Sequence, residues 1–448
     1  MEILLDHVML SRLQFAFTAM FHIIWPVLTI GLSLFIVLME ALWLKTKEEA
    51  YYRHARFWTR LFVLNFAVGV ITGIPMEFQF GTNWSVFSGA GGDIFGHLLG
   101  FEATMAFMLE AAFLGIMVWG WKRVSPRVHL FATSMVAFGS SLSAFWIMSA
   151  NAWMQTPAGG VFQDGRFFTT SNLESILNPD LPWAVSHMWV ACLEVTIFVV
   201  GAISAWRLLK RRHVDFFLKS FRIMVIAAIV ITPLQIYLGD GSGQKVAETQ
   251  PAKLSAMEAH WRTNPEGEGA SWNLLAWPNE SKQDNDWAIT IPDGLSLLVT
   301  RSFTGRVQGL RDFPAEDQPP VWLPFYSFRV MAGLGFLFFF LMVWTLWAWR
   351  KGRLRPDVIS EQKKLLLSWM AALPLSYVAV ESGWVTREVG RQPWVIYGVL
   401  RTHEAASPLP AYPIGTSLLV FAGIYSVLFI AFLLFAGYIV NRGPEGVE

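Results

Sequence analysis

Nine apolar segments, each about 20 residues long or longer, constrain this chain more than any other feature of its sequence. In the hydrocarbon core of a bilayer a helix satisfies all of its own backbone hydrogen bonds, and segments of this length suit helices. We therefore expect an all-α, polytopic membrane helix bundle. The approximate limits of the segments are 15–43, 59–78, 98–121, 129–152, 184–206, 221–239, 326–349, 365–385 and 415–440.

The composition agrees with a membrane protein and excludes two other classes. Of the 448 residues, 54% are hydrophobic and only 15% are charged, which is unlike a water-soluble enzyme. The 34 Lys and Arg residues are balanced by 33 Asp and Glu residues, so the net charge is +1 and nucleic-acid binding is excluded. The single cysteine, Cys192, cannot form an internal disulfide, so any redox chemistry requires a cofactor.

Positively charged residues are concentrated on alternate connections between the segments. Lys and Arg are frequent in 44–60, 122–128, 207–222 and 350–364, whereas the connection 79–97 contains none. By the positive-inside rule the basic connections face the cytoplasm, which places the N-terminus outside and the C-terminus in the cytoplasm. The N-terminal sequence MEILLDHVMLSR lacks the basic-then-apolar order of a cleaved signal peptide, so we expect the first segment to be retained.

The longest connection, 240–325, is polar and is predicted to lie outside the membrane. Loops of this length are usually functional or disordered. We expect a single integral membrane domain over residues 1–448, with 240–325 as an extracytoplasmic structure within it.

Several ionisable side chains lie inside the apolar segments. They are His22 in the first segment, Glu102 and Glu110 in the third, His187 in the fifth and Glu381 at the end of the eighth. A charged group at the centre of a span costs about 2.5–3.5 kcal/mol on insertion scales, so such residues usually mark ion paths or cofactors.

Each of these residues also has an ordinary structural explanation. A single membrane histidine is about as often a hydrogen-bonding residue between helices as a metal ligand. Met331 is one of 17 methionines, which pack in any apolar site, and Glu40 and Glu77 are most simply solvated or snorkelling. His97 and His403 are expected in solvated loops. Imidazole, thioether and carboxylate groups together nevertheless favour haem ligands and proton carriers over zinc or di-iron sites, since the segments contain no EXXH spacing.

Longer stretches of sequence carry a family resemblance. The most specific is GWVTREVGRQPW over residues 383–394, and the others are SRLQFAFTAMFH, GIPMEFQFGTNW, GDIFG, SANAWMQ and FRVM. Together they resemble subunit I of the cytochrome bd-type quinol oxidases over nearly the whole chain.

The resemblance implies haem ligands at four positions. His187 and Met331 match the axial pair of a low-spin haem b, and thioether ligation raises its potential. His22 and Glu381 match the single ligands of two haems at the oxygen-reducing centre, and family members differ in which of the two serves haem d and which serves the high-spin haem b. Three further residues resemble neighbours of haem propionates or ligands: Asn151, Arg329 and Arg391.

A proton route and a quinol site are also implied. Glu102 matches a carboxylate close to the haem d iron, and Glu110 and Ser143 match positions on a proton route from the cytoplasm. In the outer loop, QPAKLSAMEAHW resembles the quinol-oxidising element, with Lys253 and Glu258 at the matching positions. These two groups suit the polar ends of a quinol ring, whereas their spacing alone favours an ordinary solvated helix.

The implied activity is that of a terminal oxidase, a ubiquinol or menaquinol:oxygen oxidoreductase of the bacterial cytoplasmic (inner) membrane. Quinol is oxidised near the outer face and dioxygen is reduced to water with cytoplasmic protons, which generates a proton motive force without pumping. The implied cofactors are two haem b groups and one haem d. The implied partners are membrane lipid, quinol, dioxygen, a second large membrane subunit (subunit II) and small accessory subunits.

Two features set the chain apart from the best-known branch of that family. Its outer loop lacks a long C-terminal insertion, and Tyr377 stands four residues before Glu381 where other members have Trp. Both features also resemble the cyanide-insensitive branch, in which a third haem b takes the place of haem d. The identity of the third haem therefore stays open between haem d and haem b.

Two other functions remain as alternatives. One alternative is an electron conduit that contains haem b and is linked to quinone but does not reduce oxygen. Such a conduit needs only haems with two axial ligands, whereas His22 and Glu381 each match the single ligand of a haem and so argue against it. An ion transporter would show internal repeats and broken helices, and neither is apparent in the sequence.

Overall fold

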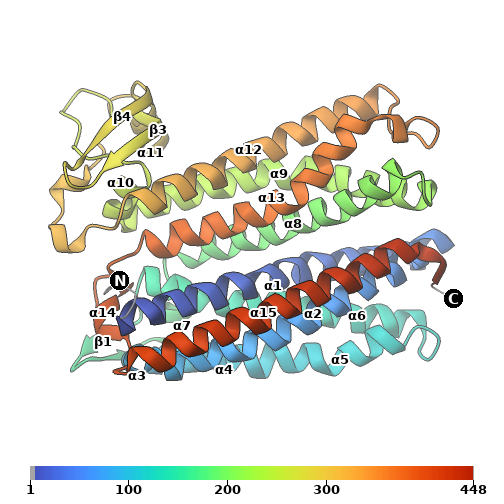
Figure 1. The fold of residues 1–448 in the computed structure, drawn as a ribbon, viewed down its shortest axis with the longest axis horizontal. Helices are drawn as coiled ribbons and strands as arrows, with labels where there is room; N and C mark the ends of the chain where they lie inside the picture. Colours follow the sequence, from blue (N-terminus) through green and yellow to red (C-terminus); the bar gives the residue numbers. More distant parts are fainter. Residues whose placement is uncertain (1–5, 447–448) are drawn as a thin grey trace.

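Long α-helices make up most of the molecule (Figure 1). The computed structural model describes residues 6–446. The longest helices are α1 (His7–Thr46), α2 (Glu49–Thr82), α6 (Pro126–Gln155), α8 (Leu181–Leu209), α9 (Val214–Thr249), α12 (Trp322–Arg350), α13 (Lys363–Val389) and α15 (Ala411–Arg442). The third predicted segment is composite and consists of α4 (Gly92–Phe101), the π-helical turn η2 (Glu102–Phe107) and α5 (Met108–Trp119).

Eight of the nine predicted segments each fall within a single α-helix, and the third, 98–121, follows α4, η2 and α5 to Trp119, which confirms the all-α membrane fold. Within residues 6–446, eight helical stretches are long and apolar enough to cross a membrane. The remaining segment, 221–239, lies in α9, which is not among those eight. With 36 residues, α9 is long enough to span a bilayer, and it packs along α8 and α12. The number of membrane crossings, nine, and the orientation of the chain in the membrane therefore remain predictions.

Local sequence explains where the helices begin. The Asp6 carboxylate accepts hydrogen bonds from the backbone N–H groups of Val8 and Met9 at 3.3 and 3.2 Å, which caps α1. Ser125 caps α6 and is followed by Pro126, whose missing N–H costs nothing in the first helical turn.

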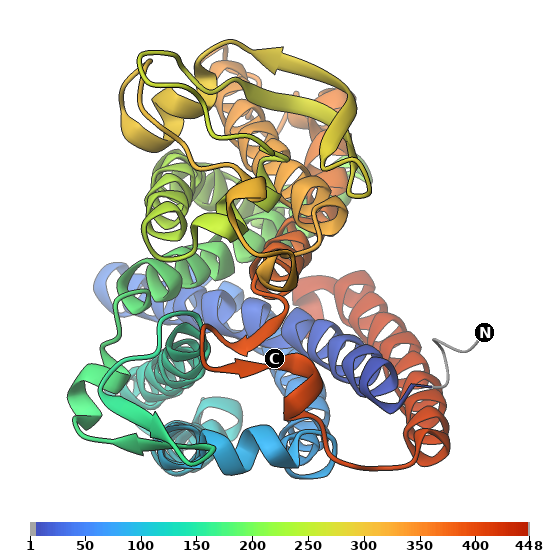
Figure 2. The same cartoon turned by 90° about the vertical axis from the view of Figure 1, so that its left-hand side faces the viewer.

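The helices form two groups that meet along α1 and α8 (Figures 1 and 2). One group contains α8, α9, α12 and α13, and the other contains α1, α2, α4, α5, α6 and α15. Large aromatic side chains fill the core and are fully buried, among them Trp58, Phe198 and Trp369. The faces of α12 and α15 instead expose large apolar side chains, such as Phe340 and Leu434, which suit lipid or a partner subunit.

The connection between α9 and α12 is folded. Helix α9 continues to Thr249, so the start of the predicted outer connection, with the sequence GDGSGQ over residues 239–244, is helical. It is followed by α10 (Pro251–Met257), the antiparallel hairpin β3 (Trp272–Asn279) and β4 (Asp284–Ile291), and α11 (Gly294–Thr300). The hairpin and the start of α1 lie at one end of the bundle, and the end of α15 lies at the other (Figure 1). This relative arrangement is the one that the predicted topology requires.

Short elements complete the fold. Two further antiparallel hairpins are β1 (Gly160–Gln163) with β2 (Arg166–Thr169), and β5 (Trp394–Ile396) with β6 (Leu400–Arg401). The short helices are α3 (Ser85–Ala90), α7 (Asn172–Ile176), α14 (Thr402–Ala405), η3 (Leu310–Asp312), η4 (Ala315–Asp317), η5 (Ile359–Glu361) and η6 (Gly443–Gly446).

Candidate functional site

His187 and Met331 lie on two helices of the same group, α8 and α12, and both of these helices contact α9. Nε2 of His187 is 3.4 Å from Nε2 of Gln235 on α9. The other ring nitrogen, Nδ1, is buried and has no hydrogen-bond partner within residues 6–446. A buried polar atom without a partner costs about 1–3 kcal/mol, and this nitrogen is therefore free to bind a ligand.

Glycines provide the space that both side chains occupy. A Cβ atom at Gly239 on α9 would lie 3.3 Å from Cε1 of His187. A Cβ atom at Gly383 on α13 would lie only 2.9 Å from Sδ of Met331, closer than a methyl group and a sulfur approach each other. The four helices thus hold an imidazole and a thioether in close-fitting positions, which suits the axial ligands of a haem iron.

Arg329, two residues before Met331, joins α12 to the outer loop. Its guanidinium donates to the Glu258 carboxylate at 2.6 Å and to the carbonyl of Asn273 at 3.0 Å. Glu258 also accepts a hydrogen bond from the indole N–H of Trp272 at 3.0 Å. Burial raises the pKa of Glu258, and the positive charge of Arg329 opposes that rise.

Lys253 lies on α10 and only 4% of its surface is exposed. Its amine donates to the carbonyl of Arg387 at 2.9 Å and to the side-chain oxygen of Gln155 at 3.1 Å. Burial, with a smaller contribution from the positive charge of Arg387, lowers the pKa of Lys253 to about 7. Because Lys253 and Glu258 are both buried, the alternative of an ordinary solvated helix is wrong.

A polar cluster at the end of α13 contains Asn151 and Arg391, two of the predicted site residues. The amide of Asn151 donates to Glu388 at 2.9 Å, and Glu388 forms an ion pair with Arg391. Arg387 forms an ion pair with Asp180 at 2.6 Å. The sequence analysis did not single out Asp180, Arg387 or Glu388, although the last two lie inside the GWVTREVGRQPW stretch.

His22 and Glu381 belong to different helix groups. Nδ1 of His22 on α1 is 3.0 Å from the Thr72 hydroxyl on α2, and a Cβ atom at Gly73 would lie 3.1 Å from its Cε1. Oε2 of Glu381 on α13 is buried and finds no hydrogen-bond partner in the described part of the chain. Because α1 contacts α13, the two residues lie on helices that meet between the groups.

The two carboxylates of the third segment each bind a serine of α6. Glu102 begins the π-helical turn η2 and accepts a hydrogen bond from Ser143 at 2.7 Å. Glu110 accepts one from Ser140. The structure thus brings the predicted Ser143 to Glu102 rather than to Glu110. Ser140 lies three residues before Ser143 and therefore on the same face of α6, and this spacing could have identified it from the sequence.

Glu40 is not solvated, contrary to our expectation. It is 1% exposed and accepts a hydrogen bond from the Thr133 hydroxyl at 2.8 Å, and it lies 2.9 Å from Nδ1 of His129. The reason is that α1 continues to Thr46 and packs along α6, which covers the carboxylate. His97 and His403, which we expected in solvated loops, are exposed but lie in α4 and α14 rather than in loops.

The residues present fit haem groups. Among residues 6–446, four buried polar atoms that belong to predicted site residues have no hydrogen-bond partner: Nδ1 of His187, Oε2 of Glu381, Nη1 of Arg329 and Nη1 of Arg391. Imidazole nitrogen and carboxylate oxygen are donors to iron, and guanidinium groups bind carboxylates such as the propionates of a haem. The unpaired atoms are therefore of the types that haem iron and haem propionates would bind.

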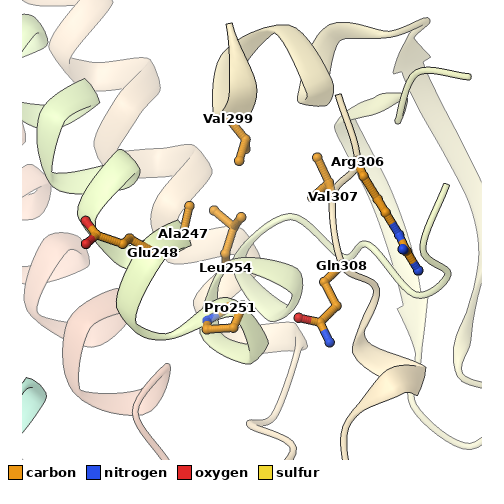
Figure 3. Close-up of a pocket in the computed structure, with 8 residues that line it drawn as sticks. All are labelled: Ala247, Glu248, Pro251, Leu254, Val299, Arg306, Val307 and Gln308. Carbon is orange, nitrogen blue, oxygen red and sulfur yellow. The ribbon is translucent and has the colours of Figure 1, made fainter. Parts of the chain in front are cut away.

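The outer loop contains a cavity of about 340 Å³ beside α10 (Figure 3). Its walls come from the end of α9, from α10, from α11 and from residues 306–308, and they include Leu254, Val299 and Arg306. Lys253 and Glu258 do not line it. The cavity thus lies next to the predicted quinol residues without including them.

Comparisons with known proteins extend over nearly the whole chain. Residues 10–444 match the model of a family described as cytochrome bd terminal oxidase subunit I. The cytochrome bd-II ubiquinol oxidase subunit 1 of Escherichia coli (strain K12) is 34% identical, and the alignment covers 99% of this chain and 98% of that protein. The cytochrome bd ubiquinol oxidase subunit 1 of Bacillus subtilis (strain 168) is 35% identical, with coverage of 95% and 91%.

A solved structure agrees with these relatives. The bd oxidase from Geobacillus thermodenitrificans superimposes with a TM-score of 0.89 at 32% sequence identity. The superposition covers 98% of this chain and 99% of that chain.

Proposed function

This chain belongs to the cytochrome bd terminal oxidase subunit I family of haem-containing quinol oxidases, and we propose that it oxidises a membrane quinol at its outer loop and reduces dioxygen to water. One observation carries the proposal. Glu258, the predicted quinol residue, binds Arg329, which lies two residues before Met331, the predicted haem ligand. The loop and the haem-binding helices are therefore in direct contact.

His187 and Met331 would hold the low-spin haem b, and His22 and Glu381 would each hold one haem of the oxygen-reducing centre. When bound, the haems carry electrons from quinol and bind and reduce dioxygen. With both His187 and Met331 as ligands, this haem would have no position left for dioxygen, so the site would serve electron transfer alone. The third haem is haem d or a third haem b.

Three residues would orient the haems rather than ligate iron. Arg329 and Arg391 each retain one buried N–H group without a partner among the described residues, and a propionate would satisfy it. Asn151 holds Glu388, the carboxylate that anchors Arg391.

Lys253 and Glu258 would bind the two oxygen atoms of ubiquinol or menaquinol. A Lys253 amine with a pKa of about 7 is partly neutral at neutral pH, so it is able to accept a quinol proton. Glu258 is able to accept the other proton, because burial raises its pKa. The adjacent cavity, with Leu254 and Val299 in its wall, offers space for apolar parts of the substrate.

Protons for water formation would reach the oxygen centre through two carboxylates, the buried Glu110 and the half-buried Glu102. Glu110 with Ser140, and Glu102 with Ser143, form two hydrogen-bonded pairs along α6. Quinol protons leave at the outer loop, whereas these pairs receive protons from the opposite side. Each charge that crosses the membrane stores about 2.3 kcal/mol per 100 mV, so this separation generates a proton motive force without a pump.

The protein would act in the bacterial cytoplasmic (inner) membrane together with a second large subunit and small accessory subunits. The exposed apolar faces of α12 and α15 support this setting, because they need lipid or a partner to cover them.

Optical spectra of the purified complex test the proposal. A reduced-minus-oxidised spectrum should contain haem b bands, and carbon monoxide should bind a five-coordinate iron. His187→Ala and Met331→Ala should each remove the low-spin signal and abolish quinol oxidation while carbon monoxide binding is partly retained. His97→Ala, at an exposed histidine, is the control and should change neither. Full quinol-driven oxygen uptake in either ligand variant would refute the pairing, and haem b without any carbon monoxide binding would favour an electron conduit.

A further inference from the structure

The β3–β4 hairpin of the outer loop packs one face against the protein and leaves the other face uncovered. Ala276 and Pro278 on β3 are buried, and the hydroxyl of Tyr326 on α12 donates to the carbonyl of Ala276 at 2.7 Å. Residues that alternate with these two point to the opposite side of the ribbon. That side carries large apolar side chains, each between 43% and 58% exposed: Leu275, Trp277, Trp287, Ile289 and Ile291.

The strand register brings these five side chains together. Leu275 on β3 and Ile289 on β4 are cross-strand partners. Side chains two positions apart on a strand share a face, so Trp277 joins Leu275 on β3. On β4, Trp287 and Ile291 join Ile289 for the same reason. Single exposed apolar residues are ordinary, whereas five on one side of a two-stranded ribbon mark a surface that contacts something else. We call these five residues the apolar face of the hairpin.

The apolar face continues onto a helix that spans the membrane. The ring of Trp277 lies edge-on to the ring of Trp322, the first residue of α12, with a centroid distance of 6.3 Å. Helix α12 is one of the described helices that are long and apolar enough to cross a membrane. Exposed apolar side chains recur along it every seven residues, and each such step turns by only about 20° around the helix. They are Leu323, Val330, Leu337 and Trp344. The hairpin and α12 lie at the same edge of the molecule (Figure 2).

The residue types at this junction are those of the boundary between water and lipid. Trp277, Trp287 and Trp322 are each about half exposed, at 46%, 50% and 46%. Tryptophan is enriched at membrane interfaces, because its ring is apolar while its N–H can bond to headgroups or water. A lipid surface therefore suits both parts of these side chains.

Charge does not explain a contact at this place. The turn between the strands and the start of β4 contain Glu280, Lys282, Asp284 and Asp286, so acids outnumber bases. The single lysine is already paired with Asp286 at 2.6 Å. Attraction to acidic headgroups is thus weak here, and the burial of apolar surface is the driving force that remains.

We propose that the apolar face of the β3–β4 hairpin docks on the lipid surface of the outer leaflet, beside the outer end of α12. The docking itself does not rest on the proposed function, but one consequence does. Trp272, the first residue of β3, donates to the Glu258 carboxylate at 3.0 Å. A docked hairpin therefore holds the predicted quinol residue beside the bilayer that supplies the quinol.

A nitroxide on either side of β4 tests the docking. The only native cysteine of the chain, Cys192, is buried, so an introduced surface cysteine is labelled selectively. Ile289→Cys places the label on the apolar face. Thr290→Cys is the matched control, because Thr290 is the next residue of the same strand, is also exposed and points to the other side. The labelled parent complex supplies the background from any other cysteine.

The measurement uses the complete oxidase in liposomes of phosphatidylethanolamine and phosphatidylglycerol, without quinol, so that no oxygen is consumed. Power saturation compares collisions of the nitroxide with oxygen, which concentrates in lipid, and with a water-soluble nickel chelate. We expect the ratio of oxygen to nickel collisions to be roughly threefold higher at position 289 than at position 290. Leu275→Cys should behave like Ile289→Cys. The difference should persist at high ionic strength and in phosphatidylcholine alone, because the contact is apolar.

Each outcome decides the inference. Equal ratios at positions 289 and 290 would overturn it, since the apolar face would then lie in water. A label at position 289 that is shielded from both oxygen and nickel would also overturn it, because a protein surface, from another subunit or a second copy, would then cover the face. These results do not depend on turnover. A complex that docks as expected but fails to oxidise quinol would refute the proposed function alone.

Discussion

Glu258 and Arg329, which are 71 positions apart in sequence, form a buried ion pair of 2.6 Å between the outer loop and α12. Their side chains are 5% and 11% exposed. Met331, a predicted haem ligand, lies two residues further along α12, so this pair joins the outer loop to the helix that carries the predicted ligand.

Arg329→Gln should destabilise the outer loop and lower quinol oxidation. It leaves the Glu258 carboxylate buried without its cation, and breaking such a pair typically costs about 3–5 kcal/mol. Thermal unfolding and limited proteolysis of the loop would measure the effect, together with quinol-driven oxygen uptake. Arg262→Gln is the control, since its ion pair with Asp284 is exposed and worth less than about 1 kcal/mol. Equal stability of the two variants would contradict the prediction.

The pH dependence of quinol oxidation should report Lys253. With a pKa of about 7, its neutral fraction rises roughly tenfold between pH 6 and pH 8, and the neutral amine is the form that accepts a proton. The rate at subsaturating quinol should rise in that interval. Lys253→Arg keeps the charge at all these pH values and should lose the rise, whereas the exposed Lys282→Arg should keep it.

The same pKa shift predicts the sign of a stability effect. The folded loop holds Lys253 with a pKa below its ordinary value of 10.5, so the unfolded chain binds more protons between pH 7 and pH 10.5. Stability of the loop should therefore increase with pH across that interval. Lys253→Met should make this increase in stability with pH smaller. If the variant shows the same slope of stability against pH as the parent, Lys253 is not the cause of the increase.

Gly383→Ala should displace Met331. The added methyl group would lie 2.9 Å from the methionine sulfur, so the thioether must move out of its position. We expect the low-spin haem b spectrum to weaken and its potential to fall, as ligation by sulfur is lost. Gly335→Ala on α12 is a matched control, because a Cβ there meets no atom of the described chain within 4 Å. An unchanged low-spin spectrum in Gly383→Ala would show that Met331 is not an axial ligand.

Glu110→Gln should slow turnover without loss of haem. The amide retains the contact with Ser140 but cannot carry a proton to the oxygen centre. Stopped-flow mixing of the reduced enzyme with oxygen would separate proton uptake from haem reduction. Glu48→Gln, at an exposed ion pair with Lys219, should behave like the parent.

Much of the fold follows from the sequence because a bilayer allows few solutions. A long apolar segment must become a helix there, so the positions of the nine helical segments were predictable, including the composite one around Glu102. The boundaries at polar ends were less predictable. Helix α9 continues through GDGSGQ to Thr249, because neighbouring elements such as α10 and α11 contact it there.

The sequence alone determined the helical membrane fold, the family, and the residue types that suit haem iron and protons, since these depend on hydropathy and on short motifs. Only the tertiary structure decided which side chains meet. Glu40 binds His129 from 89 positions away, and Lys253 binds the Arg387 carbonyl from 134 positions away. Burial and partners depend on how helices distant in sequence pack together, and no local pattern encodes that packing.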